Sequence, residues 1–143
     1  MIALDPNLLV YVHRRAVPEH AAARRAIEGG SRDSGGWGIP VPCVRGFWSV
    51  VTHPAAAGRP STPSEAASFL RSLVEAGGSL IWAPGPGFGL RLADLARRLE
   101  VRGVRVFDLP IALVAADAGA SELWSHDRRF VSLPGLPVID PLG

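Results

Sequence analysis

The sequence predicts an α/β fold in which a mostly parallel sheet of about four to five strands is flanked by helices. Short apolar runs typical of buried strands alternate with helical patterns along the whole chain. The 143 residues, 48% of them hydrophobic, are enough to bury one core. Because no linker, internal repeat or low-complexity segment divides the chain, we expect a single domain spanning residues 1–143.

Helix start and stop signals order the first half. Glu19 lies in the first turn of an amphipathic stretch, and Gly29-Gly30 is expected to end it. The elements expected here are a strand at 2–5, a helix at 18–27, a loop at 31–36, a strand at 37–41 and a helix at 43–53.

The second half begins with a capping box, Thr62-Pro63-Ser64-Glu65, which predicts a helix that runs to about Glu75. A later helix, after residue 87, is expected to turn four leucines toward the core: Leu90, Leu92, Leu95 and Leu99. The other expected elements are strands at 79–82, 104–107 and 122–125, a helix at 110–118 and an extended piece at 137–139.

Composition narrows the function classes. All 15 basic residues are Arg, which excludes any mechanism that needs a lysine ammonium, and the net charge of +2 does not by itself indicate nucleic-acid binding. No apolar run approaches the roughly 18 residues of a membrane helix, and no signal peptide is visible, so we expect a cytoplasmic protein. The single Cys43 cannot form an internal disulfide and is expected in the core. The high apolar content favours a protein partner or a homodimer.

Three aspartates each follow a short apolar run that is typical of a strand. They are Asp5 after residues 1–4, Asp108 after 104–107 and Asp127 after 123–126. Because the carboxyl ends of parallel strands meet at one edge of a sheet, we expect the three carboxylates to lie together. Carboxylates brought that close repel one another, so the arrangement predicts a bound divalent cation.

Helix capping is the alternative explanation of each aspartate, since Asp is a favoured N-cap. Asp5 precedes Pro6, Asp108 stands two residues before Pro110, and Asp127 precedes a short turn. A cap needs no second acid nearby, whereas a cation site does. The two roles are compatible, because a capping carboxylate keeps an oxygen for a metal.

Six segments carry a resemblance to a known family. They are MIALDPNLLVY at 1–11, HAAAR at 20–24, FWSVVTHP at 47–54, VFDLPIA at 106–112, ASELWSHDRRF at 120–130 and LPGLPV at 133–138. Their order and spacing, over essentially the whole chain, resemble PIN-domain proteins of the VapC toxin type. The resemblance implies a small parallel sheet between helices and a metal-dependent endoribonuclease, using Mg²⁺ or Mn²⁺, that acts on RNA and is partnered by a VapB-like antitoxin.

The same resemblance implies that Asp5, Asp108 and Asp127 are the catalytic, metal-binding acids, with Ser125 as the hydroxyl residue that precedes the last of them. This chain departs from the family pattern at two positions. Gly46 stands where the family usually carries a Glu, and Arg129 stands where a further Asp is common. Three aspartates suffice for one Mg²⁺ ion, which takes one or two direct carboxylates and keeps several waters.

Four side chains are candidates for supporting roles. Arg129 or Arg45 would stabilise the transition-state charge, the alternative being a solvated surface Arg. Asn7 and Ser125 would orient a metal-bound water or a carboxylate, the alternative being local turn bonding.

Three function classes follow. The first is a divalent-metal-dependent endoribonuclease that is the toxin of a toxin–antitoxin pair. The alternative is a degenerate PIN domain with weak or no nuclease activity that still binds an antitoxin or RNA. A phospho-acceptor domain also places Asp at strand ends, but its chemistry depends on a Lys that this chain lacks.

Overall fold

Five short strands form one sheet in the order β3-β2-β1-β4-β5, and every neighbouring pair is parallel. The computed structural model describes residues 1–33, 35–56 and 58–143. The strands are β1 (Ile2–Leu4), β2 (Trp37–Pro40), β3 (Leu80–Trp82), β4 (Glu122–Trp124) and β5 (Val138–Ile139). The expected parallel α/β sheet is therefore confirmed, and β1 lies at its centre.

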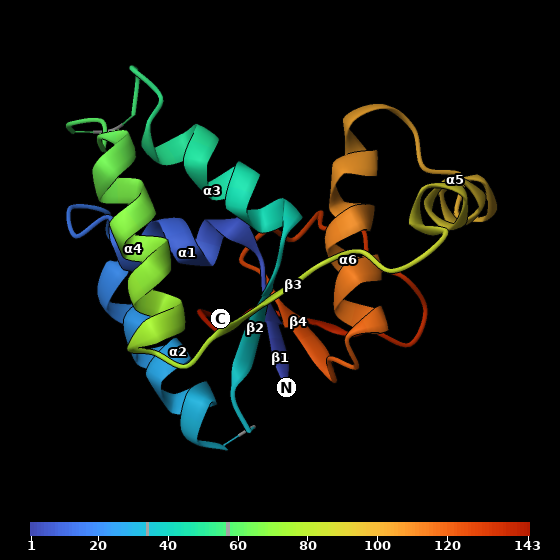
Figure 1. The fold of residues 1–143 in the computed structure, drawn as a ribbon, viewed down its shortest axis with the longest axis horizontal. Helices are drawn as coiled ribbons and strands as arrows, with labels where there is room; N and C mark the ends of the chain where they lie inside the picture. The colour runs from blue at the N-terminus through green and yellow to red at the C-terminus, as the bar shows by residue number, and fades with distance from the viewer. Residues whose placement is uncertain (34, 57) are drawn as a thin grey trace.

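Helices cover both faces of this sheet. They are α1 (Pro6–His13), α2 (His20–Asp33), α3 (Pro42–Val51), α4 (Pro63–Glu75), α5 (Phe88–Arg98) and α6 (Asp108–Asp117), with a 3₁₀ helix η1 (Gly103–Phe107) before α6. In Figure 1, α1, α2 and α4 lie on one side of the sheet, and α5 and α6 lie on the other. Within the described part of the chain, no helix is both long and apolar enough to cross a membrane.

The core lies between the central strands and the helices. Every residue of β1 and β2 is buried, as the crossover connections on both faces of a parallel sheet require. Phe47 of α3 and Leu123 of β4 are fully buried in the same cluster. Cys43 is also completely buried, as expected, and its thiol donates to the Leu4 carbonyl at 3.3 Å.

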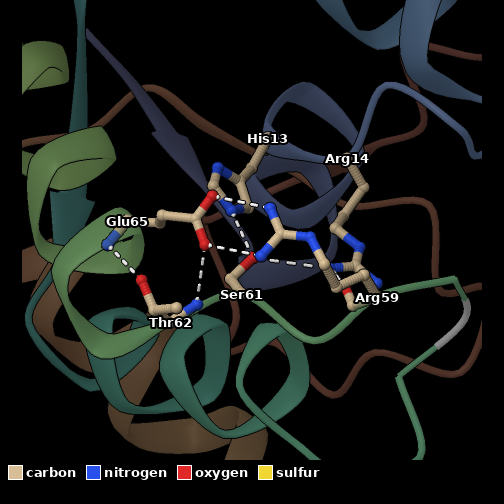
Figure 2. A network of polar contacts seen from close by, with 6 residues as sticks. All are labelled: His13, Arg14, Arg59, Ser61, Thr62 and Glu65. Carbon is tan, nitrogen blue, oxygen red and sulfur yellow. Dashed lines mark hydrogen bonds and ion pairs between the residues drawn. The ribbon is translucent and has the colours of Figure 1, made fainter.

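The capping box at the start of α4 is confirmed. The Thr62 hydroxyl accepts from the Glu65 amide, and the Glu65 carboxylate accepts from the Thr62 amide. Figure 2 shows that the same carboxylate also pairs with both terminal nitrogens of Arg59, at 3.1 and 2.9 Å. Arg14, just beyond α1, donates to the Arg59 carbonyl at 2.7 Å. The network thus ties the segment before α4 to the end of α1.

Helix α2 is longer than its sequence signals predict. The expected stop at Gly29-Gly30 is wrong, because the helix continues to Asp33 and so takes up part of the expected 31–36 loop, in which residue 34 lies outside the described residues. A Cβ at Gly30 would lie 2.6 Å from the Trp124 indole. Glycine is therefore present here because β4 places a large ring against the helix backbone, and not because the helix ends.

The strand expected at residues 104–107 is the second correction. This segment forms the 3₁₀ helix η1, so Asp108 follows no strand and instead begins α6. The side chains of Val104 and Phe107 are 70% and 58% exposed. An apolar run predicts a strand only if it is buried, and the five-stranded sheet is complete without this one.

Two further differences concern helices. The segment from Pro6 to His13 was not expected to be helical, yet it forms α1 and buries Leu8 and Leu9. In α5, Leu95 is buried as expected, whereas Leu90 is 85% exposed and does not face the core. Leu92 and Leu99 pack against the second, smaller core cluster.

Candidate functional site

The carboxyl ends of β1 and β4 bring the first two candidate residues together. Leu4 is paired with Trp124 in the parallel register, so Asp5 and Ser125 leave the sheet side by side. The Ser125 hydroxyl donates to Asp5 Oδ2 at 2.5 Å, and both side chains are buried. Asp5 is the N-cap of α1, but its side chain makes no capping hydrogen bond. Capping therefore does not explain the Asp5 side chain.

Ser125 also connects Asp5 to Asp127. Its Oγ accepts a hydrogen bond from the Asp127 amide at 3.0 Å while its O–H is directed to Asp5. Asp127 Oδ1 in turn accepts from the Arg129 amide at 2.9 Å, which is the local turn bond that the capping alternative predicts. Both the orienting role and the turn-bonding role expected for Ser125 are therefore present in one hydroxyl.

Asp108 reaches the same place from the first turn of α6. Its Oδ2 accepts from the Val131 amide at 2.9 Å, which lies outside its own helix. The strand that was expected before Asp108 is absent, because residues 103–107 form a 3₁₀ helix. Asp108 nevertheless lines the same cavity as Asp5 and Asp127. The three predicted acids thus share one site, although only two of them follow strands.

A cavity of about 740 Å³ lies over this edge of the sheet. Its wall is formed by α1, α3 and the start of α6. The lining includes the three acids together with Asn7, Arg45, Gly46, Val50 and Phe107. Asn7 Oδ1 is buried and has no hydrogen-bond partner among the described residues. An unpaired buried amide oxygen is costly, so this atom is poised to accept a donor or a cation.

Burial and repulsion from neighbouring carboxylates raise the pKa of two of these groups, Asp5 and Asp108. Burial raises the pKa of Asp5 from its ordinary 3.8 to about 7, against the Ser125 hydrogen bond, and the Asp108 and Asp127 charges add to the rise. Burial also raises the pKa of Asp108, with Asp127 adding to it and the Val131 amide and Arg105 opposing it. These carboxylates lie close enough to oppose each other's ionisation, which a bound cation would relieve.

Arg105 is a site residue that the sequence reasoning missed. Its Nη1 lies 3.7 Å from Asp108 Oδ2 and 3.8 Å from Asp127 Oδ2, and it donates to the Arg129 carbonyl at 3.0 Å. The only sequence signal is its spacing three residues before Asp108, which places two side chains on the same face of a helix but on opposite faces of a strand. Because residues 104–107 were expected to form a strand, the sequence did not predict that Arg105 lies beside Asp108.

The other predicted arginine behaves differently. The Arg129 side chain is exposed and does not line the cavity, so its observed contributions are its amide and its carbonyl. Arg45 of α3 does line the cavity. Of the two arginines considered as a clamp for a phosphate, the geometry favours Arg45.

Gly46 of α3 packs against Pro6, the first residue of α1. A Cβ at this position would lie 3.0 Å from Pro6 Cγ and 3.2 Å from Pro6 Cβ. A glutamate here would therefore require the Pro6 ring to move by a few tenths of an ångström. The glycine serves the packing of this chain, and the missing acid is not an empty place that a side chain could simply fill.

The donor set fits a hard divalent cation, although it is not preassembled. The available ligands are the three carboxylates and the unpaired Asn7 carbonyl oxygen, all of them oxygen donors of the kind that Mg²⁺ and Mn²⁺ take. Among the described residues, however, no three His, Cys, Asp or Glu side chains are grouped closely enough to hold a metal as they stand. A metal bound by these residues would therefore require side-chain movement.

Ser125→Ala is expected to lower the free energy of unfolding of the metal-free protein by about 1–2 kcal/mol, because it removes a buried hydroxyl that serves two partners. Chemical denaturation in the presence of a chelator measures the change. Ser121→Ala is the matched control, since the Ser121 hydroxyl makes one exposed bond to the Met1 carbonyl. Equal effects of the two substitutions would contradict a special role for Ser125.

Comparison with known proteins agrees with this architecture. No protein-family model matches the chain. VapC ribonuclease Mb2897 of Mycobacterium bovis and ribonuclease VapC43 of Mycobacterium tuberculosis are each 30% identical over 142 residues, which cover 99% of this chain and 96% of theirs. Ribonuclease VapC48 of Mycobacterium tuberculosis is 28% identical over 137 residues, covering 96% and 94%.

Solved structures share the fold. Mycobacterium tuberculosis VapC20, described as a sarcin-ricin loop cleaving toxin, superposes with a TM-score of 0.67 at 11% identity, covering 91% of this chain and 92% of that one. VapBC2 from Rickettsia felis, bound to a DNA fragment from its promoter, gives 0.66 at 17% identity, covering 97% and 98%. With full-length relatives that are ribonucleases and a PIN-like fold, this chain belongs to the VapC ribonuclease family.

Proposed function

We propose that this protein, acting as a single PIN-like domain, is a divalent-metal-dependent endoribonuclease and the toxin of a toxin–antitoxin pair. The observation that carries the proposal is the convergence of Asp5, Asp108 and Asp127 on one 740 Å³ cavity that also holds the unpaired Asn7 oxygen. A cavity of this size admits a nucleotide-sized group. The three acids come from separate parts of the chain. Helix capping could explain each one by itself, but it would not require them to meet at one cavity.

Each side chain has a role that follows from its contacts. Asp5, Asp108 and Asp127 would hold the metal, with the Asn7 carbonyl oxygen as a further ligand. The Ser125 hydroxyl holds Asp5 in one orientation. Arg45 is placed to contact a phosphate that enters the cavity. A bound Mg²⁺ or Mn²⁺ supplies the acidified water and the charge neutralisation that phosphodiester hydrolysis needs.

The decisive test compares RNA cleavage by the native chain and by Asp108→Asn, with Mg²⁺ or Mn²⁺ present. Asn keeps an oxygen that can accept from the Val131 amide but loses the negative charge, so we expect cleavage to fall about 100-fold or more. Asp94→Asn is the control, because Asp94 is an exposed acid of α5 paired with Arg97 and Arg98. Equal rates for the native chain and Asp108→Asn would indicate a contaminating nuclease and remove the proposal.

A degenerate domain that binds but cuts poorly is the second candidate. Two observations favour it: Gly46 is packed against Pro6 where the family usually has a Glu, and Arg105 already neutralises part of the acidic site. In this case the native chain would bind RNA or an antitoxin in the same cavity without cleaving it. Cleavage abolished by Asp108→Asn excludes this alternative.

The partner we propose is a VapB-like antitoxin whose peptide covers the cavity in the cytoplasm. Two apolar side chains at the cavity are exposed, Val50 by 51% and Phe107 by 58%, as expected of a surface that a protein partner buries. The solved structures of similar fold include the VapBC2 and FitAcB structures.

We also expect a homodimer, because Leu80 and Ile81 of edge strand β3 are exposed apolar side chains. A monomeric sedimentation profile at micromolar concentration would contradict this expectation.

A further inference from the structure

One cation of the chain is already in contact with the acidic site. The Arg105 Nη1 atom lies within 3.8 Å of a carboxylate oxygen from each of Asp108 and Asp127, and its hydrogen bond to the Arg129 carbonyl holds it there. The Arg105 side chain is 35% exposed, whereas the arginines that pair along the helix surfaces, such as Arg24 and Arg71, are 62% and 74% exposed. This ion pair is therefore better shielded from water than those pairs are.

The ion pairs of Arg105 involve one carboxylate oxygen of each of two proposed metal-binding acids, Asp108 and Asp127. Ligand oxygens lie about 2.0–2.1 Å from Mg²⁺, so carboxylates that share one ion must come close together. Here both Oδ2 atoms instead face one guanidinium nitrogen, and the described residues contain no metal-ready group of acids. A divalent ion bound by these two acids would therefore share them with a guanidinium group that lies 3.7 and 3.8 Å from one oxygen of each.

We propose that Arg105 is a resident counter-cation that competes with the divalent metal for Asp108 and Asp127, and so sets the metal affinity of the site. The inference rests on the proposed function, since it assumes that these acids bind the metal. A positive charge beside the site repels a divalent ion, and its attraction for the two acids opposes their turning toward that ion. Arg105 is thus a positioning residue, which acts through the acids and does not itself coordinate the metal.

The test measures Mn²⁺ affinity of the full chain, by calorimetry or from the signal of free Mn²⁺, for the native protein and for Arg105→Gln. Removing the competing charge is expected to tighten Mn²⁺ binding roughly tenfold. Arg105→Lys keeps the charge but loses the planar fork, so its affinity should lie between those two. Arg102→Gln is the matched control: it changes the net charge equally from an exposed position just before η1, and should leave the affinity within about twofold of the native value.

Thermal unfolding gives a second readout that does not depend on cleavage. Without metal, Arg105→Gln leaves two acids without their counter-cation and should melt below the native protein. Saturating Mn²⁺ should then raise its melting temperature by more than it raises that of the native protein. An Arg105 that is only a structural brace would lower the melting temperature equally with and without Mn²⁺, and this result would overturn the proposal.

The outcomes separate this inference from the proposed function. Mn²⁺ binding that is lost in Asp108→Asn but unchanged or weaker in Arg105→Gln would overturn the role of Arg105 and leave the metal site standing. Binding that appears only in Arg105→Gln would support the competition directly. If neither the native chain nor Arg105→Gln binds Mn²⁺, both the competition and the metal-dependent function fail.

Discussion

Asp5→Asn is expected to stabilise the metal-free protein by about 2–4 kcal/mol at pH 8 while removing its metal-dependent activity. The side chain is buried, and its pKa is raised to about 7 from an ordinary value of 3.8. In the unfolded chain the carboxyl loses its proton near pH 4, whereas in the folded chain it keeps the proton until about pH 7. The native protein therefore loses stability as the pH rises through this window, and the neutral amide does not.

The measurement is the free energy of unfolding of both proteins from pH 4 to pH 8, with a chelator present. The two curves should differ least at the acid end, where Asp5 is protonated in the folded state and about half protonated in the unfolded state, and should diverge up to about pH 7, above which the difference levels off. A constant difference across the whole range would contradict a buried, titrating Asp5. A site that gains stability when its charge is removed is typical of residues kept for function.

Phe47→Ala is expected to cost about 3–5 kcal/mol, the typical range for a fully buried phenylalanine. The ring is 0% exposed, stacks on Phe69 at 5.2 Å between centroids, and meets the His13 ring edge-on at 5.3 Å. It therefore joins α3 to both α4 and α1. His13 also shares a hydrogen bond with Ser61 in the network of Figure 2. The void left by the Phe47→Ala substitution should therefore loosen the segment before α4 as well.

Urea denaturation of Phe47→Ala and Phe47→Leu measures this effect, and the leucine variant should recover most of the loss because it refills the volume. Phe107→Ala is the matched control, since that ring is 58% exposed, and it should change stability by less than about 0.5 kcal/mol. A similar cost for the two alanine variants would show that the α1–α3–α4 junction is not a principal part of the core.

Local signals in the sequence were enough to predict elements whose cause is local. The capping box at Thr62 needs only four consecutive residues, and it forms as expected. The buried strands β1 and β2 follow from short apolar runs that lie where the sheet is covered on both faces. Asp5 and Ser125 meet because parallel strands end at a common edge, which the alternation of strands and helices already implies.

Features that depend on a partner distant in the sequence could not be found in this way. Gly30 looks like a helix stop, but its reason is the Trp124 ring more than 90 residues away. Residues 104–107 have the composition of a strand, yet the sheet has no place for them, and the resulting 3₁₀ turn brings Arg105 to Asp108 and Asp127. Gly46 resembles a lost catalytic acid until the Pro6 ring is seen against it.

The sequence by itself determined the parallel α/β class, the family resemblance and the choice of three candidate acids, because these depend on residue type, order and local periodicity. The tertiary structure alone decided that burial holds the pKa of Asp5 near 7, that Asn7 is left without a partner and that Arg105 shares the acids. The physical reason is that desolvation, packing and ion pairing depend on distances through space, which the order of residues along the chain does not specify.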